Sequence, residues 1–303
     1  MWEIDSLHHD PLAMDGSSSF FTDSVEESSY ILSFKVPIDE ILGANQEISL
    51  LVRRERGLLV GLADFCARFL RQSDERRSKC HSIMQSQSKL QECSVSIELL
   101  EEALQNTGRK RNNRKRQRKQ LAGHPYVLER SDCFCNKDHL YMNVRARLIT
   151  RDRSLDESSR QQLVSETSVA ILQKIFFQPD KTDFLGKDEL LGHLACLLLQ
   201  QKLRLQLPEL GAIAFCGDGS ILPRRSGTSD APMASPPAVP FKAPSGSPMT
   251  KASLEISLGC LAKHLPFSLD YGISRCTDSS VALSGLVIPE GITLICGGGY
   301  HGE

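Results

Sequence analysis

The amino-acid sequence predicts an α+β protein, in which a mixed N-terminal domain is followed by the first strands of a second, incomplete α/β domain. Three observations lead to this prediction. Residues 140–148 alternate apolar and polar side chains, as in a strand with one solvated face. Between Glu55 and Arg71, apolar residues recur every three or four positions, which indicates an amphipathic helix. Ile292–Cys296 is a short apolar run rich in β-branched residues, which predicts a buried strand.

The remaining elements of the first domain, which we place at residues 29–216, follow from the same patterns. Residues 1–28 are polar and without a sustained period, so we expect them to be disordered. Ser29–Val36 predicts a strand that ends at a proline. Four further segments complete the prediction: helices over about 74–105, 156–177 and 188–205, and a buried strand over 212–216.

The second domain is predicted to begin after a linker. Seven of the fourteen prolines fall between Pro223 and Pro248, and each removes a backbone donor, so residues 217–250 are expected to be an extended linker. Residues 251–303 then form the incomplete domain. Its predicted strands are 253–258 and 281–287, in addition to the apolar run near the end of the chain.

Composition places the protein in a broad class. The chain has 303 residues, 40% of them hydrophobic, which is long enough for one to three domains. No apolar run reaches the roughly 18 residues of a membrane-spanning helix, and the acidic N-terminus lacks the features of a targeting segment. We therefore expect a soluble intracellular protein without a membrane partner, cytoplasmic or nuclear, with an organelle left open.

The ten cysteines lack the paired C-x-x-C spacing of a zinc or redox site. Buried, reduced thiols are the expected state, and no metal site is predicted. Cys133 and Cys135 are separated by one residue, which leaves two alternatives: ordinary strand residues, or a pair with a metal or redox role.

A strongly basic tract interrupts the first domain at residues 109–119. Eight of its eleven residues are basic, namely Arg109, Lys110, Arg111, Arg114, Lys115, Arg116, Arg118 and Lys119. Such a density of like charge must lie in solvent or on a polyanion. Three alternatives stay open: an RNA or DNA contact, a nuclear import signal, and a solvated insertion. No aromatic residue lies within the tract, so contact with nucleic acid is expected to be independent of sequence.

Three consecutive glycines follow the apolar run Ile292–Cys296, and Gly297 and Gly302 are five positions apart. This is the glycine spacing of the P-loop, G-x-x-x-x-G-K-[ST], whose backbone N–H groups close around phosphates. The candidate phosphate-binding residues are Gly297, Gly298, Gly299, Tyr300, His301 and Gly302. Glu303 stands where the motif has lysine, so we expect this chain not to bind ATP with useful affinity.

Two segments resemble the signature blocks of one family. Residues 211–227 and 288–302, joined by the proline-rich stretch, are similar to those of the predicted ATPases of the ABC class. In that family the second block continues into Lys-Ser-Thr. The resemblance implies an N-terminal domain followed by the opening strands of an ABC-type nucleotide-binding domain, with the chain ending inside the Walker A motif. Arg224 and Arg225, within the first block, become candidates for phosphate or nucleic-acid contacts.

The resemblance also implies cofactors and partners. A complete family member uses ATP and Mg²⁺ and pairs head to tail as a homodimer, whereas this chain is expected to bind neither cofactor. The first functional hypothesis is the N-terminal portion of an ABC-class ATPase linked to RNA or other nucleic acid. The alternative is a non-enzymatic nucleic-acid-binding or interaction protein derived from the family. No catalytic residue is predicted, and enzyme activity is left open because the lysine, the Ser/Thr and the catalytic half of the domain are missing.

Overall fold

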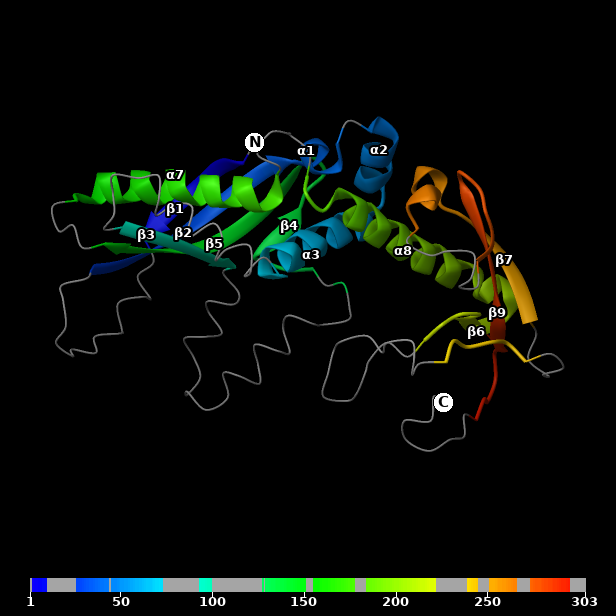
Figure 1. The fold of residues 1–303 in the computed structure, drawn as a ribbon. Coiled ribbons are helices and arrows are strands. Elements are labelled where there is room, and N and C mark those ends of the chain that lie inside the picture. The colour runs from blue at the N-terminus through cyan, green and yellow to red at the C-terminus, as the bar shows by residue number, and fades with distance from the viewer. Residues whose placement is uncertain are drawn as a thin grey trace. The chain divides into compact units, whose positions relative to one another are not determined.

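The computed structural model describes residues 2–9, 26–43, 45–72, 93–99, 127, 129–150, 155–177, 184–221, 239–244, 251–265 and 273–294. These residues form two compact units, the first comprising those up to Lys187 and the second those from Asp188 onward (Figure 1). Each unit combines helix with an antiparallel sheet, so the predicted α+β class is confirmed. The division falls near residue 187, whereas the sequence placed the first boundary at residue 216.

The first unit is built on a five-stranded sheet in the order β1-β2-β5-β3, with β4 also paired to β5. The strands are β1 (Glu3–His9), β2 (Glu26–Pro37), β3 (Cys93–Leu99), β4 (Cys133–Cys135) and β5 (His139–Thr150). Along its whole length β5 pairs with β2, and its other edge is shared by β3 and β4. The strand predicted at 140–148 is therefore confirmed, and it lies in the interior of the sheet.

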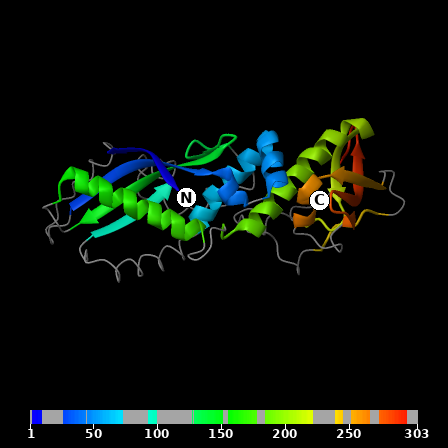
Figure 2. The same cartoon turned by 90° about the horizontal axis from the view of Figure 1, so that it is seen from above.

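One face of this sheet is apolar because alternate residues of β2 and β5 meet there. Tyr30, Leu32, Phe34 and Val36 are fully buried, as are their register partners on β5. The helix α7 (Glu157–Phe176) lies along this face, in contact with β1, β3 and β5 (Figures 1 and 2). Burial of these apolar side chains favours folding of the unit.

Three helices follow β2: α1 (Ile38–Leu42), α2 (Gln46–Arg54) and α3 (Arg56–Gln72). The third confirms the amphipathic helix predicted between Glu55 and Arg71, and it packs against β4. The side chain of Asn45 caps α2 by accepting hydrogen bonds from the N–H groups of Glu47 and Ile48. Neither α1 nor α2 was predicted from the sequence.

An aromatic cluster joins α3 and α7. The ring of Phe176 lies 5.3 Å from that of Trp2, 5.6 Å from Phe69 and 5.9 Å from Phe184, measured between centroids. Phe184 closes the cluster through a bridge to Phe177. These contacts tie the two ends of the first unit's chain to its central helices.

The second unit begins with α8 (Lys187–Gln206), the helix predicted over 188–205, and the short helix η2 (Pro208–Leu210). Its sheet has the order β6-β9-β7, with β8 also paired to β9. The strands are β6 (Ala212–Gly217), β7 (Lys251–Ser257), β8 (Ile273–Cys276) and β9 (Ser280–Pro289), and the short helix η3 (Gly259–His264) follows β7. A small core of Leu207, Ala212 and Val287, with Phe215 packed against it, joins the end of α8 to the sheet.

Two predictions for the first unit were wrong. Residues 2–9 and 26–28 belong to the fold although residues 1–28 were predicted to be disordered, because β1 pairs with β2 and Trp2 is buried. The segment 93–99, placed inside a predicted helix over 74–105, is strand β3. Its residues Val95, Ile97 and Leu99 alternate toward the apolar face of the sheet, and that period of two decides the structure. The remaining residues of both segments lie outside the described ranges.

Two predictions for the second unit also need correction. Ile292 and Leu294 are exposed and belong to no strand, so the buried strand predicted at Ile292–Cys296 is not formed in its described part. Within the described ranges no strand pairs with this segment, and an unpaired apolar run cannot satisfy its backbone groups as a strand does. The strand predicted over 212–216 exists as β6, but it lies at the end of the sheet and Ile213 is exposed.

Candidate functional site

The residues predicted to contact phosphates or nucleic acid lie outside the described ranges. These are Gly297, Gly298, Gly299, Tyr300, His301 and Gly302 of the glycine turn, Arg224 and Arg225, and the whole basic tract at 109–119. What the structure does describe is the framework that adjoins these residues in the chain: β6, β9 and the turn after β6.

The pairing of β6 with β9 brings the two signature blocks together. β6 belongs to the first block, and β9 leads into the second. Ala212 lies opposite Pro289 and Ala214 opposite Ile288, and the N–H of Glu290 donates to the carbonyl of Gly211 at 2.9 Å. Segments about 75 residues apart in the sequence therefore start side by side in one antiparallel ladder.

Gly285 allows the backbones of β9 and β6 to lie close together. A Cβ atom at Gly285 would approach Phe215 Cζ to 2.6 Å and Gly217 Cα to 2.8 Å, and would also meet the carbonyl oxygen of Cys216. Two of these three atoms belong to the backbone, which cannot move aside as a flexible side chain can. Glycine is therefore required where β9 passes the end of β6.

Asp218 organises the turn that follows β6. Its Oδ1 accepts a hydrogen bond from the N–H of Ala243 at 2.6 Å, and its Oδ2 accepts one from the hydroxyl of Ser284 at 2.9 Å. The turn is closed further by backbone hydrogen bonds that join Gly219 and Ser220 to Phe241. One carboxylate thus ties together the turn, the residues around Ala243 and the central strand β9.

The negative charge of Asp218 also affects the neighbouring thiol. Burial, and secondarily this carboxylate, raise the pKa of Cys216, so the thiol stays protonated at neutral pH. Cys216 is thus unsuited to act as a nucleophile.

The residues before Arg224 and those before Gly297 leave the β6–β9 ladder at its opposite ends. On β6, the chain runs on toward Arg224 and Arg225 from Gly217. On β9, it runs on toward Gly297 from Pro289, which lies opposite Ala212 at the other end of β6. At the rise of an antiparallel strand, Gly217 and Ala212 are about 17 Å apart. The β6–β9 pairing therefore joins the two blocks, but it does not by itself bring Arg224 and Arg225 close to Gly297–Gly302.

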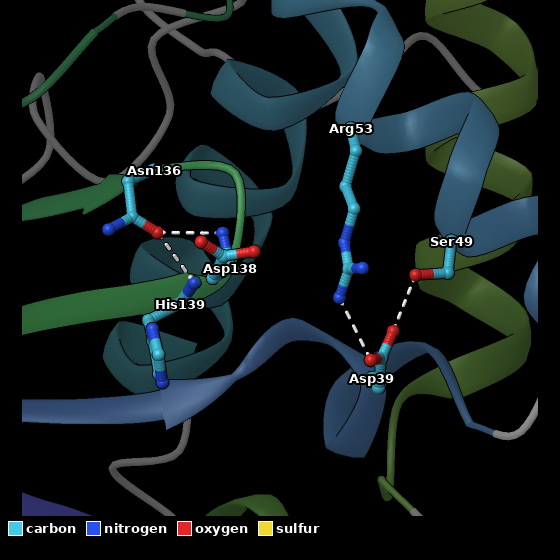
Figure 3. A network of polar contacts seen from close by, with 6 residues as sticks. All are labelled: Asp39, Ser49, Arg53, Asn136, Asp138 and His139. Atoms are coloured by element: carbon cyan, nitrogen blue, oxygen red, sulfur yellow. Dashed lines mark hydrogen bonds and ion pairs between the residues drawn. The ribbon is translucent and has the colours of Figure 1, made fainter.

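The polar networks of the first unit are structural. The carboxylate of Asp39 accepts hydrogen bonds from Ser49 Oγ and from Arg53 Nη2, which fixes α1 against α2 (Figure 3). In the turn between β4 and β5, Asn136 Oδ1 accepts from the N–H groups of Asp138 and His139 (Figure 3). Both networks hold local chain geometry, and neither aligns a nucleophile with a base.

The predicted alternatives for Cys133 and Cys135 can now be compared. Cys133 is buried and its thiol donates to the carbonyl of Ala63 at 3.2 Å. Burial, and secondarily the neighbouring Cys133, raise the pKa of Cys135 well above its usual range. Over the described ranges no three His, Cys, Asp or Glu residues are grouped to hold a metal ion.

Arg145 and Arg147, two residues apart on β5, differ in environment. Arg147 is half exposed and its Nη2 donates to Glu98 Oε1 at 2.8 Å, whereas Arg145 is buried. Both lie on β5, the central strand of the sheet, which explains why Arg145 is not at a solvent-facing edge.

The site residues that sequence reasoning missed are Ser284 and Gly285. The strand over 281–287 was predicted, but no local pattern pairs Asp218 with a serine 66 residues away. A glycine and a serine inside an apolar strand were the available signal, since glycine in a strand often marks a close backbone approach.

The comparison with family models bears on the second unit, which contains both sequence blocks. Residues 186–303 match the family model ABC_ATPase, described as a P-loop domain. The resemblance to the ABC-class ATPases is therefore confirmed for this part of the chain. A comparison with proteins of curated function finds no similar sequence. Among the described helices, none has the length and apolar character needed to cross a membrane.

Proposed function

We propose that the second unit carries the beginning of an ATP site of the ABC class, in which the glycine turn Gly297–Gly302 approaches the phosphates. The observation that carries this proposal is the β6–β9 ladder, because it joins the two blocks on which the family resemblance rests. Asp218 and Gly285 hold that ladder and its turn in place. ATP and Mg²⁺ are the ligands that a complete site of this class binds.

We further propose that this chain does not use the site for hydrolysis. Glu303 occupies the position at which the P-loop has lysine, and a carboxylate there repels the phosphates that a lysine attracts. At about 4 Å and an effective dielectric near 20, each unit-charge pair is worth roughly 4 kcal/mol, an upper bound for a side chain that can turn away.

Calorimetric titration with MgATP tests this function. For the unmodified chain we expect a Kd weaker than about 1 mM, and Glu303→Lys should tighten binding at least tenfold, about 1.4 kcal/mol. The matched control is Glu290→Lys, which makes the same charge change at an exposed residue of the same unit. Micromolar binding by the unmodified chain, or equal gains in both variants, would contradict the proposal.

The second candidate function is a sequence-independent contact with single-stranded RNA or DNA through the basic tract. It is favoured by the eight positive charges within eleven residues. If all eight meet phosphates, log K should fall with log[salt] at a slope of about −5 to −6. Fluorescence anisotropy with a labelled oligonucleotide measures this slope. Replacing the eight residues by Gln should abolish it, whereas Arg54→Gln, outside the tract, should leave it unchanged; a slope near zero in the unmodified chain excludes this function.

A further inference from the structure

We draw no further inference here: the strongest candidate, the stacked rings of Phe134 on β4 and Tyr141 on β5 on the sheet face of the first unit that lies opposite the apolar one, carries nothing because the neighbouring Lys35 is already paired with Asp5 and nothing in the described ranges shows what covers the rings.

Discussion

Replacing Asp64 by alanine should lower the free energy of unfolding of the first unit by about 3–5 kcal/mol, the usual cost of breaking a buried ion pair. Asp64 is fully buried on α3. Its Oδ1 accepts from Arg130 Nε and lies 2.9 Å from Nη2, and its Oδ2 accepts from Arg68 Nε at 2.6 Å. The side chain of Arg130 is only 7% exposed, so removal of the carboxylate leaves its guanidinium charge buried without this counter-ion.

Urea denaturation followed by tryptophan fluorescence measures this loss. The chain has one tryptophan, Trp2, whose ring packs against Phe34 and Phe176 in the first unit, so the signal reports on that unit. Asp39→Ala is the matched control. Asp39 also pairs with an arginine on a helix but is 56% exposed, so its loss should cost about 1 kcal/mol or less. Equal losses in the two variants would contradict the assignment of Asp64 as a buried charge centre.

Gly285→Ala should destabilise the second unit by about 1–3 kcal/mol, because the new methyl group overlaps the backbone of β6. Hydrogen exchange read by mass spectrometry measures the effect as faster exchange in peptides that cover 212–217 and 281–289. The expected loss of protection is confined to the β6–β9 ladder and its neighbours. MgATP binding in the Glu303→Lys background should weaken in parallel, since the ladder joins the two blocks.

Ser253→Ala is the control for this substitution. Ser253 is exposed on β7 and paired with β9, so it tests a small change in the same sheet without a steric conflict. Unchanged exchange in Gly285→Ala would show that β9 shifts away from β6 at no cost. In that case the close contact would not be what holds the two signature blocks together.

The helices and strands that the sequence predicted correctly are those whose pattern is long and undisturbed. The helices at 56–72, 157–176 and 187–206 and the strand at 139–150 are each longer than ten residues. In α7 the buried residues are Val164, Ser168, Ile171, Leu172, Ile175 and Phe176. Packing against the sheet of the first unit, and not the periodicity of α7 alone, determines which residues of α7 are buried.

The wrong predictions concern segments whose structure depends on contacts with residues far away in the sequence. β1 is polar along most of its length, and it is ordered because β2 pairs with it and Trp2 fills a space beside Phe34 and Phe176. Leu99 continues the alternation of Val95 and Ile97, which is typical of a strand. Together with Leu100 and Leu104 it also fits the period of a helix, and the pairing with β5 decides in favour of the strand. Ile292–Leu294 is the opposite case, in which a sequence that favours a strand does not form one. Among the described residues no strand pairs with it, and it stays outside the sheet.

The candidate site was predictable as sequence blocks and not as geometry. The glycine spacing and the two blocks carry a resemblance to the ABC-class ATPases, and residues 186–303 match the family model ABC_ATPase. The hydrogen bond between Asp218 and Ser284 and the close approach at Gly285 depend on a pairing between segments far apart in sequence. No periodicity within either segment contains that information.

The arrangement of β3 and β4 on one edge of β5 has a consequence for the length of chain that can join them. β3 ends at Leu99 opposite Val144, and β4 begins at Cys133 opposite Met142, so the connection leaves and rejoins the sheet two residues apart on the same strand. Doubling the length of such a connection costs only about 0.6 kcal/mol in closure entropy. Changes in the length of the chain between Leu99 and Cys133 therefore cost the paired strands little in closure entropy.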